Sequence, residues 1–227
     1  MKRVRILTLL VATVAVGGVV LTACGDDTPP ETRLFVLDGV EFRLDDVAPY
    51  VAFLDSFLPE GGRKTKIMRV LEEHLIPLRL AQRAFPTERR EQQEAAMALR
   101  SIASNVQELT AHAAMVKNQM KNHISRTSAL LPVAIWAFEP LHMGAVSDPI
   151  EVPYGWLVVG CHEITESPGL AMDDYVDAHQ VGFVTHTAGD WFKWYEAQKP
   201  LLANKATFFH PDYVTAIPQW IQPPKLP

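Results

Sequence analysis

The chain has 227 residues, a formal net charge of −5 and a mean hydropathy of +0.03. Acidic residues (26) outnumber basic ones (21), and phosphate binding needs clustered Lys and Arg, so the composition argues against nucleic acid as a partner. The length allows one or two small domains, and two cysteines, Cys24 and Cys161, permit at most one intrachain disulfide.

The first residues have the layout of an export signal. Lys2, Arg3 and Arg5 precede an apolar run at positions 6–23, as in a secretory signal peptide (1–23). The run ends in Leu-Thr-Ala followed by Cys24, which resembles the bacterial lipobox. The resemblance implies cleavage before Cys24 and its acylation, and several acyl chains anchor a protein firmly to a membrane. The alternative is an uncleaved transmembrane helix, because positions 6–23 are just long enough to span a bilayer.

A short polar segment, 24–33, contains Gly25, Asp26 and two prolines and is predicted to be a tether. Removing the three basic residues of the leader changes the formal charge from −5 to −8. In Gram-negative lipoproteins, an aspartate directly after the lipidated cysteine resembles the signal for staying in the inner membrane. Here that position is Gly25, so the predicted location in a Gram-negative envelope is the outer membrane, facing the periplasm. With Cys24 acylated, Cys161 has no disulfide partner and is expected to be a small buried hydrophobe.

Helices are predicted for most of the first half. Asp38-Gly39 between the apolar runs 34–37 and 40–42 indicates a hairpin, and a helix is expected over 44–58. A second helix is predicted from an apolar face with 3.6-residue spacing, formed by Ile67, Val70, Leu71, His74, Leu75 and Leu78. Pro77 is expected to kink this helix, and Pro86 is expected to end it. The pattern then predicts one long helix to about Asn122, or two with a break. Its solvated face is expected to carry Arg89, Arg90, Glu91 and Glu94.

The second half is predicted to contain a short helix over 130–138, then two strands joined by the turn Pro153-Tyr154-Gly155. The spacing of Met172, Tyr175, Val176 and His179 indicates a further helix. Asp190 is expected to cap a last helix over 191–197, and the proline-rich tail is expected to be irregular. The predicted class is α+β, mostly α-helical, with an N-terminal hairpin and long helices around a small strand pair.

Residues 137–159 carry a family resemblance. The run Ala-Phe-Glu-Pro-Leu-His-Met-Gly-Ala-Val-Ser-Asp-Pro-Ile-Glu-Val-Pro-Tyr-Gly-Trp-Leu-Val-Val resembles the C-terminal half of a parvulin-type peptidyl-prolyl isomerase. The hairpin and helices before it are similar to the entry of the SurA/PrsA-type foldases, some of which carry the same kind of lipid anchor. The resemblance implies a helical chaperone-like domain (34–128), a parvulin-like remnant (129–165) and a closing helical, proline-rich segment (166–227).

The family's catalytic positions are replaced here. The place of its second His is Leu157, and the walls of its proline pocket correspond to Ala129 and Val133. Most elements between the family's first strand and the matched segment are missing, although His123-Ile124-Ser125 resembles that strand. We therefore predict no catalytic residues and weak or no isomerase activity. The expected peptide-binding residues are Phe138, Tyr154 and Trp156.

Two other patterns bear on chemistry. His162-Glu163 followed by Glu166 lacks the second His of the zinc-protease motif, and no phosphate-binding or dinucleotide-binding glycine pattern is present, so no metal and no cofactor are predicted. Trp191, Phe192, Trp194 and Tyr195 either pack inward, with Phe192 on the flank, or expose an aromatic patch for a peptide or membrane interface. Inward packing is favoured, because aromatic side chains dominate core energetics.

Three functions remain open. The first is a lipid-anchored envelope foldase that binds unfolded or extended polypeptide clients. The second is an active peptidyl-prolyl cis-trans isomerase. The third is a structural envelope lipoprotein that serves as an interaction platform.

Overall fold

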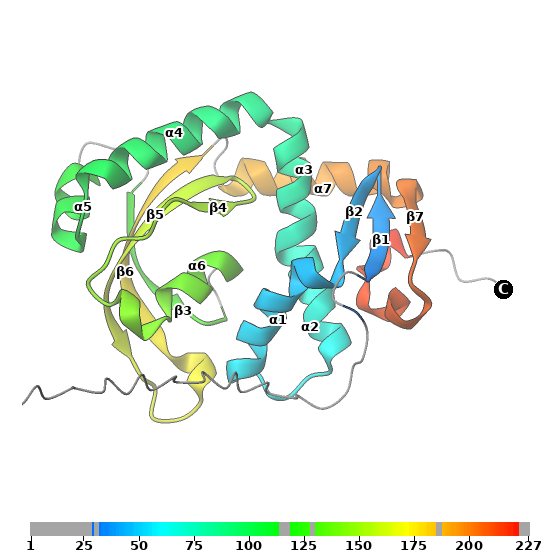
Figure 1. Ribbon diagram of the computed structural model, residues 1–227, viewed down its shortest axis with the longest axis horizontal. Coiled ribbons are helices and arrows are strands. Elements are labelled where there is room, and N and C mark those ends of the chain that lie inside the picture. Colours follow the sequence, from blue (N-terminus) through cyan, green and yellow to red (C-terminus); the bar gives the residue numbers. More distant parts are fainter. Residues whose placement is uncertain (1–28, 30–31, 114–118, 128–129, 185–187, 223–227) are drawn as a thin grey trace, which may run out of the picture.

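The computed structural model describes residues 29, 32–113, 119–127, 130–184 and 188–222 (Figure 1). The predicted α+β class, with more helix than strand, is confirmed. The predicted signal peptide, Cys24 and most of the predicted tether lie outside these residues. Among the helices of the described residues, none has the length and apolar character needed to cross a bilayer.

The two ends of the described chain form a small antiparallel sheet. Strand β1 (Arg33–Leu37) lies between β2 (Val40–Arg43) and β7 (Ala206–Phe209). The predicted hairpin is confirmed, and its turn has positive φ at Asp38 (48°) and Gly39 (79°), as two-residue hairpin turns of this kind require. The predicted irregular tail is wrong for β7, because residues 206–209 gain backbone hydrogen bonds to β1 that only the folded chain provides.

Four helical segments follow the hairpin. They are α1 (Leu44–Phe57), α2 (Arg63–Val70), the π turn η1 (Leu71–Leu75) and α3 (Ile76–Ala84). Pro77 has no N–H to donate to the carbonyl four residues earlier, and its ring crowds that carbonyl. The helix accommodates this with one wide turn, in which the N–H of Ile76 bonds the carbonyl oxygen of Leu71, five residues earlier. The predicted kink therefore takes the form of a π turn.

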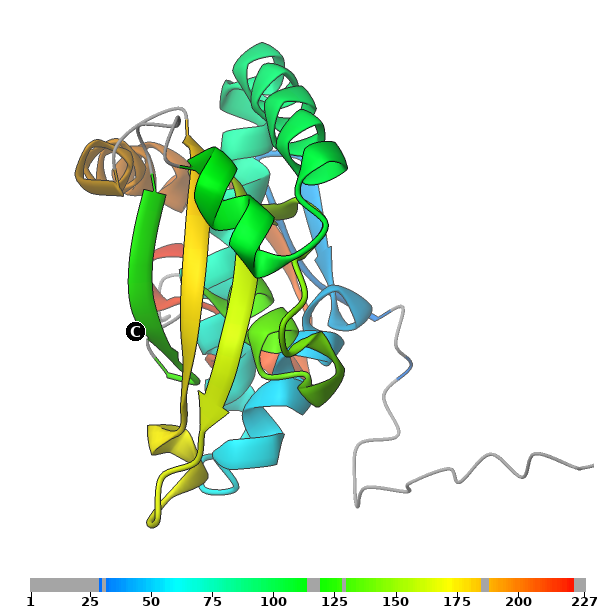
Figure 2. The same cartoon turned by 90° about the vertical axis from the view of Figure 1, so that its left-hand side faces the viewer.

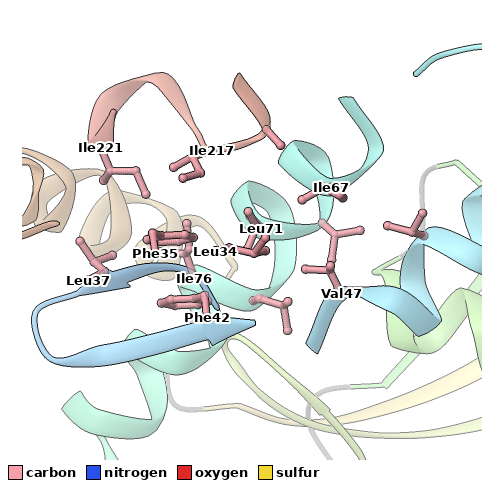
Figure 3. Close-up of a cluster of buried hydrophobic side chains, with 14 of the residues drawn as sticks. Leu34, Phe35, Leu37, Phe42, Val47, Ile67, Leu71, Ile76, Ile217 and Ile221 are labelled. Carbon is pink, nitrogen blue, oxygen red and sulfur yellow. The ribbon is translucent and has the colours of Figure 1, made fainter. Parts of the chain in front are cut away.

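These segments share one hydrophobic core with the C-terminal part of the chain. The latter comprises α7 (Ala188–Leu202), a short turn η4 (Ala203–Lys205), β7, and the 3₁₀ turns η5 (Pro211–Ala216) and η6 (Gln219–Ile221). Figure 3 shows Ile217 and Ile221 beside Phe35, with the Phe35 ring stacked on Phe42. We call residues 33–85 and 188–222 the N/C lobe, since both ends of the chain are needed to fill its core.

The described residues between 86 and 184 form the inserted lobe. Its antiparallel sheet has the order β3-β6-β5-β4, and helices cover both faces (Figures 1 and 2). Buried side chains of α6 pack on the face toward the N/C lobe, and those of α4 and α5 pack on the outer face. The elements in chain order are α4 (Pro86–Ile102), α5 (Val106–Ala113), β3 (Gln119–Ser125), α6 (Leu131–Ala137), η2 (Pro140–His142), β4 (Ile150–Val152), β5 (Gly155–Thr165), η3 (Ala171–Asp173) and β6 (Tyr175–Val184).

Several predicted helices differ from the structure. The helix expected to reach Asn122 ends earlier, because residues 119–125 pair with β6 as a strand. The helix expected around 172–179 is wrong, because β6 is held on both sides by β3 and β5, and this long-range pairing overrides the local spacing. Asp190 lies within the first turn of α7 and is not its cap. The predicted segments 34–128, 129–165 and 166–227 each contribute to the four-stranded sheet.

His74, on the π turn, is 2% exposed in the core of the N/C lobe. Its Nε2 is 3.0 Å from the hydroxyl oxygen of Tyr50, and burial lowers the pKa of His74 from 6.5 to about 4. The folded protein therefore keeps this ring neutral, whereas the unfolded chain binds a proton below about pH 6.5.

We expect the free energy of unfolding to fall by about 3 kcal/mol at this site as the pH drops from 6.5 to 4, because the unfolded state alone takes up the proton. Urea unfolding across this range measures the loss, and His74→Gln is expected to flatten the pH dependence. The exposed His162 provides the matched control, since His162→Gln is expected to keep the wild-type slope. An equal slope in wild type and His74→Gln would contradict this assignment.

Candidate functional site: an aromatic cleft between the lobes

A cleft of about 470 Å³ opens where the two lobes meet. The N/C lobe contributes residues of η1, the start of α3 and one face of α7, and the inserted lobe contributes Leu130 and the β4–β5 turn. We call it the aromatic cleft. Its lining comprises Glu72, Glu73, Pro77, Leu130, Pro153, Tyr154, Trp191, Phe192, Tyr195, Glu196 and Lys199.

Helix α7 supplies the aromatic wall. Trp191 and Tyr195 are buried one helical turn apart, with parallel rings whose centroids are 6.3 Å apart. The ring centroids of Trp194 and Trp191 are 4.7 Å apart. Phe192 remains 62% exposed. The predicted inward packing, with Phe192 on the flank, is therefore confirmed. Burial, together with Glu72 and Glu196, raises the pKa of Tyr195, so its hydroxyl remains protonated and lies 3.4 Å from the carbonyl oxygen of Glu72.

The opposite wall is the turn that joins β4 to β5. Tyr154 at its tip packs against the cores of both lobes, and burial raises the pKa of its hydroxyl. Gly155 follows, where a Cβ would collide with the backbone of Phe183 and Val184 on β6. Only glycine permits this close approach, which draws the turn tightly against the sheet.

Arg89 on α4 holds the β4–β5 turn in place through hydrogen bonds and an ion pair. Its guanidinium donates to the carbonyl oxygens of Val152 and Pro153, both at 2.9 Å, and pairs with the Glu151 carboxylate at 2.8 Å. The amide of Gln82 on α3 donates to the other oxygen of Glu151 at 3.0 Å. The prediction that Arg89 lies on a solvated face is wrong, because its side chain is 5% exposed.

Sequence reasoning missed Arg89 although a signal was present. Arg89 lies seven residues before Ala96 and ten before Leu99, so it shares the buried stripe of α4. A charge on an apolar stripe indicates a buried partner, and that partner, Glu151, lies far away in the sequence.

Glutamates at the cleft leave it with an excess of negative charge. Lys199 pairs closely with Glu196 (2.6 Å), lies 3.9 Å from Glu72 and sits 4.9 Å above the centre of the Tyr195 ring. Arg69, outside the lining, pairs with Glu73 at 2.9 Å. The lining itself holds three carboxylates and one ammonium group. Among the described residues, the ion-pair partner of the Glu72 carboxylate is Lys199, at the long distance of 3.9 Å.

The predicted peptide-binding residues do not form one site. Tyr154 lines the aromatic cleft, whereas Phe138 is buried beneath α6 with the Arg126 guanidinium 4.3 Å from its ring centre. Trp156 packs on the opposite face of the sheet with Val158 and Phe183. Tyr154 lies in the turn before β5, and Phe138 directly follows α6. Side chains alternate between faces along a strand, so Trp156 on β5 faces away from the cluster that holds Phe138.

The positions aligned with the isomerase pocket belong to the core. Leu157 on β5 and Val133 on α6 are 2% and 1% exposed and pack in the same cluster between α6 and the sheet. Ala129 and Cys24, the predicted lipidation residue, lie outside the described residues. Cys161 is a buried hydrophobe, as predicted, and burial raises the pKa of its thiol to about 12.

His162 and Glu163 lie on strand β5, not on a helix as the zinc-protease motif requires. Within the parts of the chain that the structure describes, no three His, Cys, Asp or Glu side chains are grouped so that they could hold a metal.

Comparisons with known proteins add no assignment: no protein-family model, no curated protein and no solved structure matches this chain. The functional argument therefore depends on the cleft itself.

Replacing Arg89 with Ala is expected to lower the free energy of unfolding by about 3 kcal/mol, because two carbonyl oxygens and the Glu151 carboxylate lose their donor. The measurement is the urea midpoint at constant slope. Arg90→Ala, at the exposed neighbouring position, is the control and is expected to change stability by less than about 0.5 kcal/mol. Equal stabilities of the two variants would disprove the role of Arg89 in holding the turn.

Proposed function

We propose that this protein is a lipid-anchored envelope lipoprotein that binds unfolded or extended polypeptide in the aromatic cleft, with weak or no prolyl isomerase activity. The observation that carries the proposal is the cleft itself. An open, largely apolar hollow lies between two lobes, with one wall of tryptophan, phenylalanine and tyrosine and the other formed by Tyr154.

The exposure of Phe192 supports polypeptide binding. In the free protein, Phe192 lines the cleft and is 62% exposed to solvent, so burial of its ring against a bound segment is favourable. Covering about 100 Å² of its ring would contribute about 2.5 kcal/mol, at roughly 25 cal/mol per Å². Trp191 and Tyr195 beside it are rigid and already packed, so a bound segment loses little free energy to their ordering.

Weak or absent isomerase activity is supported by the burial of Leu157 and Val133. Rotation about a prolyl bond has a barrier of about 20 kcal/mol, and an isomerase must present a pocket and polar groups to the twisted amide. Leu157 and Val133 instead fill the core between α6 and the sheet with apolar side chains.

Membrane attachment is proposed from the leader and from Cys24. In a bacterial host, Cys24→Ser is expected to abolish incorporation of labelled palmitate and to shift the processed protein from the membrane to the soluble fraction, since the acylated thiol is lost. Cys161→Ser, at the buried second cysteine, is the control and is expected to retain both label and membrane fraction. Retention of label by Cys24→Ser would contradict the proposed anchor.

Phe192→Ala is expected to weaken binding of a reduced and alkylated, permanently unfolded client about ten-fold, because the exposed ring no longer covers it. Fluorescence anisotropy of the labelled client, titrated with the mature chain carrying Cys24→Ser, gives the Kd. Phe208→Ala is the matched control, since Phe208 is an exposed aromatic residue on β7 outside the cleft lining. The wild-type chain is also expected to suppress aggregation of a refolding client.

Two results would overturn the proposal. Acceleration of cis-to-trans conversion of a proline tetrapeptide would make the protein an isomerase. Loss of client binding in Leu170→Ala, with Phe192→Ala unaffected, would move the site to a second hollow of about 430 Å³, between the end of α1 and the β5–β6 connection.

A further inference from the structure

We propose that the aromatic cleft prefers extended segments in which one Lys or Arg lies beside an aromatic or aliphatic residue, and that it holds them through side chains and not by strand addition. The basic group is placed at Glu72, and the apolar group against Phe192 and Tyr154. This inference rests on the proposed function, because it names the class of polypeptide that the same cleft takes.

The charges at the cleft favour a single bound cation. Glu73 is paired with Arg69, and Glu196 is paired with Lys199, each by a contact shorter than 3.0 Å. Glu72 lies 3.9 Å from the same Lys199, whose ammonium group is already close to Glu196. One carboxylate therefore remains weakly compensated, and a single cation in the bound segment matches it.

The groups around Glu72 show how a cation is held in this part of the cleft. The Tyr195 hydroxyl donates to the Glu72 carbonyl oxygen, which ties the π turn to the aromatic wall of α7. Lys199 demonstrates that a cation is accommodated there, since its ammonium group lies over the Tyr195 ring and beside a carboxylate. A basic side chain of a client at Glu72 would meet a carboxylate that lines the same cleft as Phe192, and its neighbour would reach the exposed ring of Phe192.

The described backbone at the cleft offers few hydrogen-bonding groups to a bound client. Strand addition needs free N–H and C=O groups on an edge strand, and β4 is the edge of its sheet. At the end of β4, however, the carbonyl oxygens of Val152 and Pro153 already accept hydrogen bonds from Arg89. Pro153 has no N–H, and neither does Pro77, which also lines the cleft. A client backbone therefore finds few partners here, which leaves recognition to side chains.

Four ten-residue peptides of otherwise identical sequence test the proposal. The first contains Arg-Phe at its centre, the second Gln-Phe, the third Glu-Phe, and the fourth Arg-Phe with three N-methylated peptide bonds that cannot donate. Binding to the mature chain carrying Cys24→Ser is measured by calorimetry at 50 mM and 500 mM salt. We expect the Gln peptide to bind about five-fold more weakly than the Arg peptide at low salt and the Glu peptide more weakly still.

The salt dependence and a charge variant supply the controls. The preference for Arg over Gln is expected to shrink at 500 mM salt, where charges are screened within about 4 Å. Glu72→Gln is expected to remove that preference by weakening binding of the Arg peptide to about the level of the Gln peptide. Glu91→Gln, at an exposed position on α4 away from the cleft, is expected to retain the preference. The N-methylated peptide is expected to bind within two-fold of its parent.

The possible failures are distinguishable. Equal binding of the Arg, Gln and Glu peptides, or an unchanged preference in Glu72→Gln, would overturn the charge selection and leave the proposed function standing. Loss of binding by the N-methylated peptide alone would replace side-chain recognition with strand addition. If no peptide and no unfolded client bound, and Phe192→Ala instead reduced binding to phosphatidylglycerol vesicles, the cleft would be a membrane contact and the proposed function itself would fail.

Discussion

Strand β1 pairs with β2 on one side and with β7 on the other, and the architecture depends on this pairing of the two ends of the chain. Because β7 and the turns after it supply part of the N/C core, the chain between α3 and α7 must leave the N/C lobe and return to it. The described residues between 86 and 184 form this inserted lobe, which is built around a sheet of its own. The aromatic cleft lies at the seam that results, so its two walls come from different cores.

Each wall is held before any ligand arrives. Arg89 and the close approach of Gly155 to β6 hold the β4–β5 turn and with it Tyr154, while parallel packing of Trp191 and Tyr195 fixes the face of α7. The π turn has a related effect on the helix between the walls, because it places Glu72 and Glu73 at the cleft and the neighbouring His74 in the core. A preformed site loses little conformational entropy on binding, which favours a binding role for an apolar hollow.

Parts of the site were predictable, but their assembly was not. The parvulin resemblance indicates Tyr154 as a candidate, and the density of aromatic residues indicates the cluster around Trp191. Nothing local indicates that these segments face each other, because their proximity depends on how the inserted lobe docks on the N/C lobe. The parvulin resemblance groups Phe138 and Trp156 with Tyr154, yet Phe138 lies in the core between α6 and the sheet, and Trp156 lies on the opposite face of the sheet.

The sequence by itself determined the hairpin at Asp38-Gly39, the buried face from Ile67 to Leu78, the distortion before Pro77, the α+β class and the inward packing of Trp191 and Tyr195. Each of these follows from turn chemistry, helical periodicity or side-chain character within a few residues. Only the tertiary structure decided that residues 119–125 and 175–184 are strands, that the tail closes a sheet with β1, and that Arg89 is buried against Glu151. The physical reason is that strand pairing and buried ion pairs gain their free energy from partners distant in sequence, which local patterns do not encode.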